Sequence, residues 1–576
     1  MHEGDIILYP IKNAYRQCID LSGFWDFRFD HENVGKQENW CNRFSNNVPI
    51  AVPASWNDQF AEERDFLGPA WYQTIFTVPL GWEDQKIFLR FGSVNYLTDV
   101  WINTEFIGSH EGGHLPFEFE VTNNLQKGEN IIVIRVDGNL SSDRVPPSGS
   151  SFVFPPSNFD FFPFCGIHRP VLLYSVPKKH LKDIFVITEI QDEEGILNIK
   201  VSLKNAGQDQ IKFILKGDNT LLEKKLVEGG DLIETSLHVK NPNLWSPNNP
   251  FLYDLTVQLL KEEVIFDSYS LKIGIRTIAV KGNQLLLNGE PIYLYGFGRH
   301  EDFPITGRGY VPAVIIKDYS LMKWIGANSF RTSHYPYSEQ MIDLADRLGI
   351  LIIDEIPAVG LTFDSNYIDR HLGLCQQYMR ELISRDKNHP SVIMWSMANE
   401  PKSSTRSNSF FRSIYDLAKK IDPSRLITLA NMMGVKDNAF EFCDLICINR
   451  YYGWYTEPGQ ITKGLENLSR ELDKLYQIYN KPIILSEFGV DTIPGVHAQP
   501  PEMFSEEYQV EFLTRHISLL RTKDYVVGEH IWNLCDFKTG QSIRRMGGMN
   551  YKGVFTRDRK PKMVVHELKR LWKGKD

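Results

Sequence analysis

Two glutamates in the C-terminal half of the chain stand at the ends of apolar runs, where a shared site could form. Glu400 follows the run at residues 392–397 within Asn399-Glu400-Pro401, and Glu487 ends the run at residues 482–487. Cleavage of a glycosidic bond with retention of configuration needs two carboxyl groups. One protonates the leaving oxygen, and the other, about 5 to 5.5 Å away, attacks the anomeric carbon. This pair is typical of that chemistry.

Other polar residues end neighbouring runs and widen the choice. Asp354 and Glu355 end residues 350–355, so the pattern contains more carboxylates than one mechanism needs. Any one of these acids is equally well explained as a capping or salt-bridge residue, and Arg331 or Arg347 could pair with Asp354 and Glu355. These acidic residues indicate a catalytic site only when they are considered together.

Eight short apolar runs after residue 289 could position these residues. They lie at residues 291–296, 327–332, 350–355, 392–397, 426–431, 445–450, 482–487 and 526–532. Stretches with the apolar period of a helix lie between them or follow the last one, for example residues 341–348 and 465–479. Eight strand–helix units predict a catalytic (β/α)8 TIM barrel, in which chemistry is built at the C-terminal ends of the strands.

The first half of the chain is rich in strands. Up to about residue 177, runs such as residues 71–78 and 130–136, separated by Gly, Pro and Asn, predict an antiparallel, jelly-roll-like β-sandwich. Residues 197–203 and 253–259 alternate apolar and polar side chains, which predicts an immunoglobulin-like sandwich of about seven strands. We therefore expect three domains, at residues 1–178, 179–277 and 278–576.

The composition disfavours some classes of function. The chain has 576 residues with 63 basic and 72 acidic side chains, a net charge of −9, so we expect no nucleic-acid partner. Aromatic residues make up 12%, which favours a pocket lined by rings, as in sugar-binding proteins. No clustered Cys/His set, HExxH motif or glycine-rich phosphate loop predicts a metal or an organic cofactor.

Two further features bear on location. The seven cysteines are scattered without a CxxC pair, which predicts reduced thiols and not a disulfide framework. The start Met1-His-Glu-Gly-Asp has no basic residues followed by an apolar core, and no window approaches eighteen apolar residues. We expect a cytoplasmic chain with neither a signal peptide nor a membrane segment.

Two long segments resemble signatures of glycoside hydrolase family 2. Residues 385–400 resemble its acid/base signature, and residues 158–173 resemble the signature of its sugar-binding domain. The order of sandwich, immunoglobulin-like domain and barrel is also similar to that family over essentially the whole chain. Within the family the chain resembles the β-glucuronidases most, in residues 331–337, 449–455, 486–492 and 550–562.

The resemblance implies roles for individual residues. Glu400 would be the general acid/base and Glu487 the nucleophile, with Tyr451 holding Glu487 ionised and oriented. Asn399 would bond the sugar 2-hydroxyl, an interaction that strengthens at the transition state. The other sugar-binding residues that it implies are Asp160 from the first domain, and His300, His334, Asn449, Tyr455 and Trp532 from the barrel.

The segment at residues 550–562 is the most discriminating. In β-glucuronidases its Asn-x-Lys core contacts the substrate carboxylate, which maps to Asn550 and Lys552. A glucuronide has a carboxylate where a glucoside has a neutral hydroxymethyl, so a lysine and an amide donor suit the glucuronide. The resemblance also implies a carboxylate-contacting arginine. Arg545 is our choice. Arg544 stays open as the alternative, because an additional residue, Met549, precedes Asn550.

The resemblance implies an exo-acting, retaining β-glucuronidase without a cofactor. Its substrates would be glucuronide conjugates or glucuronate-ended oligosaccharides, and analogy suggests a homo-oligomer such as a tetramer. Residues 358–368 pass almost at once into the next helix, so we expect the long active-site lid of some bacterial relatives to be missing. Alternatives are a β-galacturonidase, a β-galactosidase, a β-mannosidase, or a carbohydrate-binding protein without catalysis.

The ionisation of the two glutamates is a further expectation. Two neighbouring carboxyl groups with different roles must differ in their protonation. Hydrogen bonding is expected to lower the pKa of Glu487, and the charge of Glu487 is expected to raise the pKa of Glu400.

Overall fold

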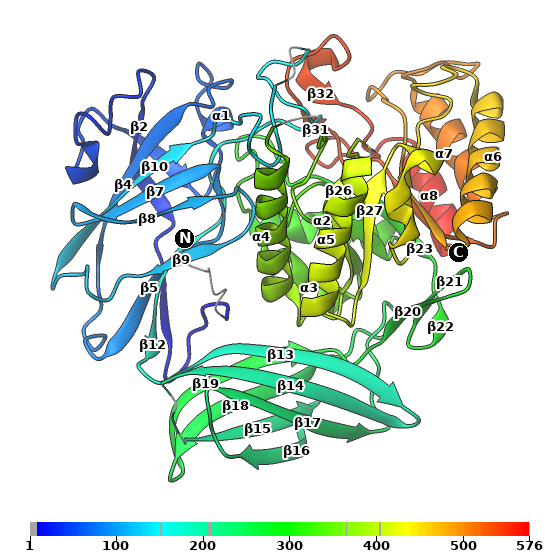
Figure 1. Ribbon diagram of the computed structural model, residues 1–576. Helices are drawn as coiled ribbons and strands as arrows, with labels where there is room; N and C mark the ends of the chain where they lie inside the picture. Colours follow the sequence, from blue (N-terminus) through cyan, green and yellow to red (C-terminus); the bar gives the residue numbers. More distant parts are fainter. Residues whose placement is uncertain are drawn as a thin grey trace.

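The computed structural model describes residues 8–149, 152–205, 207, 209–363, 366–402 and 405–574. Figure 1 shows a β-sandwich at the left, a second sandwich at the bottom and a barrel at the right. The predicted fold class, two β-sandwiches followed by a TIM barrel, is confirmed. The expectation of no signal peptide rests on residues 1–5, which lie outside the described residues.

The first domain packs a six-stranded sheet, β3-β2-β4-β10-β7-β8, against a four-stranded sheet, β1-β12-β5-β9. Alternate residues of both sheets point inward, and rings such as Trp25 and Tyr72 fill the space between them. The strands of the two sheets are β1 Gln17–Asp20, β2 Gly23–Phe29, β3 Val48–Val52, β4 Pro69–Thr77, β5 Gln85–Phe91, β7 Leu97–Ile102, β8 Glu105–Glu111, β9 Phe117–Glu120, β10 Glu129–Asp137 and β12 Val171–Pro177. Outside them lie a short pair, β6 Val94–Asn95 with β11 Gly166–Ile167, and the short helix α1 Trp56–Gln59.

The second domain is a smaller sandwich of seven strands. A three-stranded sheet, β13-β14-β17, packs on a four-stranded sheet, β16-β15-β18-β19, across a core of aliphatic side chains. Their bounds are β13 His180–Gln191, β14 Glu194–Lys204, β15 Gln210–Gly217, β16 Thr220–Val227, β17 Leu232–Lys240, β18 Tyr253–Lys261 and β19 Val264–Ile273. The alternation seen in the sequence is the inward and outward alternation of β14 and β18.

The barrel is a closed ring of eight parallel strands, preceded by a small sheet of β20 Ile278–Lys281, β21 Gln284–Leu287 and β22 Glu290–Pro291. Each of the eight predicted apolar runs overlaps one barrel strand. These are β23 Leu294–Gly298, β24 Ser329–Arg331, β25 Leu351–Glu355, β26 Val392–Asn399, β27 Leu426–Asn431, β28 Ile446–Asn449, β29 Ile483–Phe488 and β30 Val526–Ile531.

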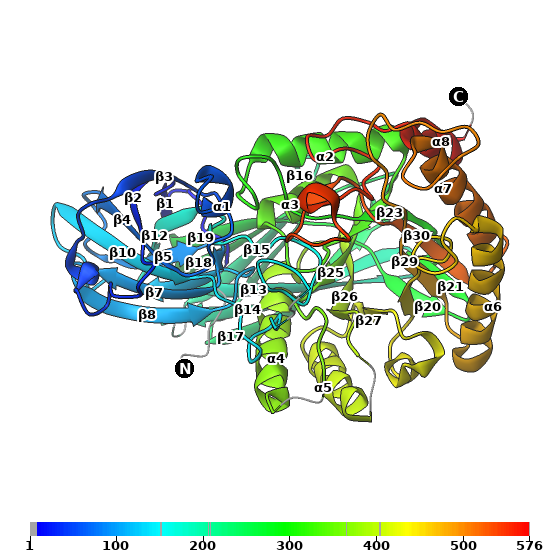
Figure 2. The same cartoon turned by 90° about the horizontal axis from the view of Figure 1, so that it is seen from above.

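Helices surround the barrel on the outside (Figure 2). They are α2 Pro312–Ile325, α3 Glu339–Leu348, α4 Ile368–Asp386, α5 Thr405–Ile421, α6 Ile461–Tyr479, α7 Glu506–Leu520 and α8 Val564–Lys573. The expectation of a helix after every strand is wrong after β27. There the described chain forms two short 3-10 helices, Gly434–Lys436 and Asn438–Glu441, because residues 432–445 are too few for a helix and two connections.

Two segments that are far apart in the sequence meet above the barrel. A loop of the first domain approaches the segment after β30, where Phe154 and Gln541 form a β-bridge and the backbone N–H of Phe162 donates to the carbonyl of Lys538 over 2.9 Å. That segment holds the paired strands β31 Phe537–Lys538 and β32 Met549–Asn550. Figure 2 shows the cyan loop and the red segment side by side. The first domain therefore contributes to the mouth of the barrel.

Among the helices of the described residues, none is long and apolar enough to cross a membrane.

Candidate active site

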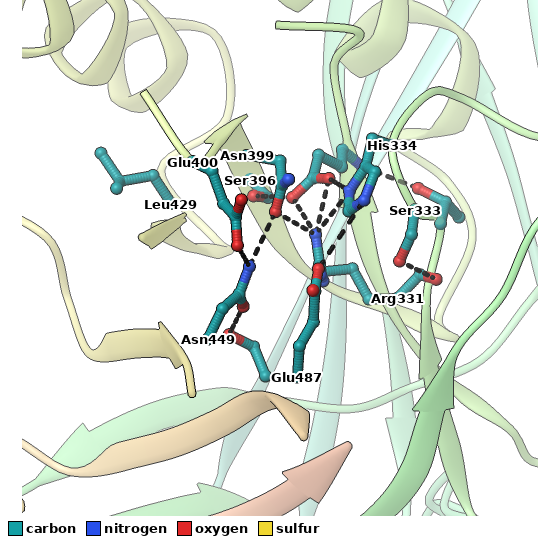
Figure 3. A network of polar contacts seen from close by, with 12 residues as sticks. Arg331, Ser333, His334, Ser396, Asn399, Glu400, Leu429, Asn449 and Glu487 are labelled. Atoms are coloured by element: carbon teal, nitrogen blue, oxygen red, sulfur yellow. Dashed lines mark hydrogen bonds and ion pairs between the residues drawn. The ribbon is translucent and has the colours of Figure 1, made fainter. Parts of the chain in front are cut away.

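Polar residues gather at the C-terminal ends of five barrel strands. Arg331 ends β24, Glu355 ends β25 and Asn399 ends β26. Asn449 ends β28, and Glu487 is the last residue but one of β29. All five are buried. Parallel strands present their C-terminal ends at one rim of a barrel, so these side chains meet there. Figure 3 labels Arg331, Asn399, Asn449 and Glu487 in the network that they form.

The Glu487 carboxylate accepts hydrogen bonds from two side chains. Arg331 Nη2 donates to Oε1, and the Tyr451 hydroxyl donates to Oε2 over 2.7 Å. His334 Nε2 lies 3.7 Å from Oε1. The carboxylate is therefore fixed in one orientation at the mouth of the barrel, as a nucleophile must be.

Glu400 directly follows β26 and joins the same network through an amide. Asn449 Nδ2 donates to Glu400 Oε1 over 2.9 Å and to Asn399 Oδ1 over 3.1 Å. Asn399 Oδ1 also accepts from Arg331 Nη1 over 3.3 Å. The φ of Glu400 is 48°, in the left-handed region that is uncommon for a glutamate. Contacts thus connect Glu400 through Asn449, Asn399 and Arg331 to Glu487.

Arg331 lies between two carboxylates. Its Nη1 donates to Glu355 Oε1 over 2.7 Å, while its Nη2 faces Glu487. Ser396 Oγ donates to Glu355 Oε2 over 2.6 Å, and His334 Nδ1 lies 2.9 Å from Glu355 Oε1. Glu355 is therefore a fully paired acid, and the salt-bridge alternative for this residue is correct, with Arg331 as its partner.

Arg347, the second arginine suggested as a partner of Asp354 and Glu355, lies outside the site. Arg347 pairs with Asp343 on the surface of α3 over 2.6 Å. Asp354 is fully buried and accepts a hydrogen bond from Thr332 over 2.9 Å. Neither residue takes part in the network of Figure 3.

The pKa of both glutamates is raised. For Glu487 the expected lowering is wrong, because burial outweighs Arg331 and the Tyr451 hydrogen bond and raises the pKa to about 8. For Glu400 the expected rise is confirmed, but its main cause is burial and not the charge of Glu487. In this site desolvation is stronger than the hydrogen bonds that favour the ionised form.

Rings form one wall of the site. Trp532, just after β30, stacks on His334 with ring centroids 5.0 Å apart and 11° between the planes. His300 meets the edge of Trp532 at 5.3 Å and contacts the Tyr335 hydroxyl through Nδ1 at 3.1 Å. Burial holds the pKa of both histidines well below the usual value, which favours the neutral form of both rings.

A second polar cluster lies where the first domain meets the segment at β32. Asp160 Oδ1 accepts from Arg545 Nε over 2.6 Å, and its Oδ2 accepts from Arg545 Nη2 over 2.8 Å. Asn550 Nδ2 also donates to Asp160 Oδ2 over 2.6 Å. The structure thus brings together the first-domain aspartate, the arginine and the asparagine that the sequence singled out.

Lys552 belongs to the same cluster. It is 1% exposed, its Nζ donates to Asp491, and it lies 2.8 Å from the Tyr455 hydroxyl. Arg545 Nη2 donates to the same hydroxyl over 2.9 Å, and its Nη1 lies 3.4 Å from Asp491. Lys552 Nζ is also 5.8 Å from the ring centre of Tyr451. Because Tyr451 bonds Glu487, this cluster adjoins the two glutamates.

Between the two candidate arginines the geometry favours Arg545. Arg544 is exposed, and its backbone N–H donates to Ser542 Oγ over 3.3 Å. Arg545 is the one that joins Asp160 and Tyr455.

Sequence reasoning missed two members of the site. Asp491 pairs with Lys552 and accepts from the backbone N–H of Tyr551 over 2.9 Å, so it orders the segment after β32. Burial raises the pKa of Asp491, but Lys552 and Arg545 outweigh it and lower the pKa overall. Arg331 was considered only as an ion-pair partner. The signal for Asp491 was its place four residues after Glu487 in a segment already singled out.

Within the part of the chain that the structure describes, no group of three or more His, Cys, Asp and Glu side chains could hold a metal ion.

Three family models match the chain and together cover almost all of it. The description "Glycosyl hydrolases family 2, sugar binding domain" matches residues 19–177, "Glycosyl hydrolases family 2" matches residues 179–276, and "Glycosyl hydrolases family 2, TIM barrel domain" matches residues 278–575. The chain belongs to glycoside hydrolase family 2 and is a glycosidase.

The names of similar proteins are more specific than the family. A β-glucuronidase of Paenibacillus borealis is 40% identical over 98% of both chains. A β-D-glucuronidase structure from Dictyoglomus thermophilum is 41% identical, with a TM-score of 0.91 over 99% of each chain. The β-glucuronidase of Ruminococcus gnavus in complex with uronic isofagomine is 36% identical, with a TM-score of 0.95 over 100% of both.

Proposed function

We propose that this glycosidase is an exo-acting, retaining β-glucuronidase. The observation that carries the proposal is the cluster of Arg545, Asn550 and Lys552 beside the paired glutamates. It offers charged and amide donors where a terminal glucuronide would present its carboxylate. The similarity to proteins named β-glucuronidase supports the same assignment.

The proposed reaction is a double displacement. Glu400 protonates the glycosidic oxygen while the Glu487 carboxylate attacks the anomeric carbon, so the aglycone leaves and a glycosyl ester forms. Glu400, now a carboxylate, then takes a proton from water, which attacks the anomeric carbon and releases Glu487. The hydrogen bonds from Arg331 and Tyr451 favour the ionised form of Glu487, which the first reaction step needs.

The remaining residues would hold the sugar. Asn399 is proposed to bond the 2-hydroxyl, and Trp532 offers an apolar face. Asp160 would bind ring hydroxyls. His300 Nε2 is buried with no partner among the described residues, and a sugar hydroxyl would satisfy it. His334 already contacts Glu355 and is proposed to act mainly by positioning.

The test of this function is a comparison of four nitrophenyl glycosides. We expect β-glucuronide to be hydrolysed far faster than β-galacturonide, β-galactoside and β-mannoside. Lys552→Ala should lower kcat/KM on the glucuronide by roughly 10- to 150-fold, the equivalent of about 1.5 to 3 kcal/mol of charge-assisted binding. Turnover of a β-glucoside, already poor, should hardly change.

A matched control is available in the same segment. Lys560 is 77% exposed and pairs with Asp558, so Lys560→Ala should leave both activities unchanged. Equal losses by Lys552→Ala on glucuronide and glucoside would contradict the specificity role and make Lys552 structural. Preference for the galacturonide would overturn the proposed substrate.

The raised pKa values predict the pH dependence. Glu487 must be ionised and Glu400 protonated, so kcat/KM should follow a bell whose acid limb lies above the ordinary carboxyl value of about 4.3. The Tyr451 hydrogen bond lowers the pKa of Glu487. Tyr451→Phe removes it, so the acid limb should move to higher pH in a kcat/KM profile on nitrophenyl glucuronide.

Tyr452→Phe is the control for this shift. The Tyr452 hydroxyl donates to Glu471 over 3.1 Å and is not bonded to either catalytic candidate, so its loss should leave the limb in place. An acid limb that stays or falls in Tyr451→Phe, or a wild-type profile flat from about pH 4 to 9, would refute the assignment.

The natural substrates are proposed to include glucuronate-ended oligosaccharides as well as small conjugates. The chain passes from β25 to α4 within residues 356–367, of which residues 364 and 365 lie outside the described residues. A long lid does not fit in this connection, so long leaving groups should enter without a steric cost. Comparable kcat/KM for such an oligosaccharide and for nitrophenyl glucuronide is expected, and no cleavage of the oligosaccharide would contradict it.

The cellular location and the oligomeric state of the enzyme are also proposals. All seven cysteines are free thiols, which supports the expected cytoplasmic location and would be checked by cell fractionation. A homo-oligomer is expected by analogy with the family, and light scattering coupled to size exclusion would test it.

A further inference from the structure

A small cavity lies between the first domain and the barrel, apart from the paired glutamates. Its volume is about 30 Å³, enough for one or two particles the size of a water molecule. Its charged lining residues are Arg169 from the first domain, and Arg299, Arg308, Arg559, Glu301 and Asp302 from the barrel. Four guanidinium groups thus share this wall with two carboxylates.

Arg308 is the arginine without a counter-charge. It is 4% exposed, and no hydrogen bond or ion pair joins its guanidinium to any described residue. The guanidinium carbon lies 4.2 Å from the ring centre of Tyr335 and 5.4 Å from that of Phe161. Ring faces offset only part of the cost of burying a full charge.

The carboxylates around the cavity are bound by other cations. Glu301 accepts from Arg169 over 3.1 Å. Asp302 accepts from Arg557, which lies behind the cavity wall, over 2.6 Å. Neither acid is paired with Arg308.

The other two arginines of the wall share a single acid. Asp318 accepts from Arg559 Nε over 2.9 Å and also pairs with Arg299. The wall therefore has an excess of positive charge that its own carboxylates do not balance.

The start of α2 adds to this excess. The cavity is also lined by Val311, Val314 and Ile315, which surround the first helical residue, Pro312. A helix start carries partial positive charge, which favours anions. At this helix start the charge acts through the dipole, because Pro312 has no N–H and the N–H groups of Val314 and Ile315 donate to the Val311 carbonyl. Helix end and buried arginine are independent features of one wall.

We propose that this cavity binds a small monovalent anion such as chloride. The anion neutralises Arg308 and contacts groups of both the first domain and the barrel, so it stabilises their interface. The small volume selects a monatomic ion over carboxylates and phosphates. This proposal does not rest on the glucuronidase assignment, because neither Glu400 nor Glu487 lines the cavity.

The direct test is diffraction from crystals of the wild-type protein grown in bromide in place of chloride. An anomalous peak inside the cavity, within contact distance of the Arg308 guanidinium, is expected. Absence of a peak there, with only a water molecule in the density, would overturn the proposal. This measurement needs no variant and is independent of activity.

A solution test uses thermal unfolding at constant ionic strength. Chloride replaces methanesulfonate, which is too large for the cavity, and Tm should rise with chloride by on the order of 2 °C and then saturate. Arg308→Met removes the charge but keeps an apolar stem, so its Tm should no longer depend on chloride. Arg412→Met changes an exposed arginine of α5 and should keep the full chloride effect.

An equal chloride effect in Arg308→Met and wild type would show general salt stabilisation and contradict the site. Should Arg308→Met fail to fold, the bromide experiment on the wild type decides alone.

Discussion

Replacing Glu487 by alanine is expected to abolish nearly all hydrolysis of nitrophenyl glucuronide, with kcat lower by roughly 10⁴-fold or more. Without this carboxylate no glycosyl ester can form, and no other described carboxylate is placed to substitute. Glu355 is bonded to the same arginine as Glu487, but it is also held by His334 and Ser396. Steady-state rates of the purified variant measure the loss.

Two checks separate chemistry from folding in this experiment. Glu511→Ala, which removes a half-buried glutamate of α7 that pairs with Arg515, should keep full activity. A 2-fluoro glucuronosyl fluoride should label the wild-type protein, and peptide mass analysis should place the adduct on Glu487. Retention of activity within about tenfold, or an adduct on another residue, would refute the nucleophile assignment.

Replacing Glu400 by alanine is the second large effect that we expect. Loss of the general acid should cost about 10²- to 10⁴-fold on a glucuronide with a poor leaving group, and less on an activated nitrophenyl glucuronide. Azide should partly restore turnover of the activated substrate, because the small anion attacks the glycosyl ester without needing a base and Glu487 leaves as a carboxylate. The product should be the β-glucuronosyl azide.

The configuration of the azide product distinguishes the roles of the two glutamates. Azide attacking the substrate directly in Glu487→Ala inverts the centre once and gives the α-azide. An α-azide from Glu400→Ala, or no azide product under any condition, would mean that the two glutamates have been assigned the wrong roles.

The sequence predicted the barrel strands because each is an apolar run buried on both faces, and such runs are visible without a structure. It predicted the rim residues for the same reason, since Asn399, Asn449 and Glu487 interrupt those runs at their C-terminal ends. The contact between Asp160 and Arg545 crosses 385 residues, and the resemblance implied only that each of the two residues would bind the substrate.

The features that the sequence did not predict depend on how opposing interactions and chain paths combine in the folded structure. Burial and hydrogen bonding act on Glu487 in opposite directions, and which one wins depends on how much water is excluded. Arg331 was visible as an arginine near two acids, but its position between Glu355 and Glu487 depends on the closure of the barrel. The missing helix after β27 likewise depends on the short path between two strands.

The contacts from Asp160 to Arg545 and Asn550 have a consequence for synthesis of the chain. Ribosomes make the aspartate first and its partners 385 and 390 residues later, so the two halves of this cluster meet only after all eight barrel strands have been made. A messenger RNA truncated after the codons for β30 but before the codon for Lys552 yields two sandwiches and all eight barrel strands, but no complete site. Catalytic activity in a cell extract therefore counts only the chains that reach Lys552, whereas antibodies against the sandwiches would also count the shorter fragments.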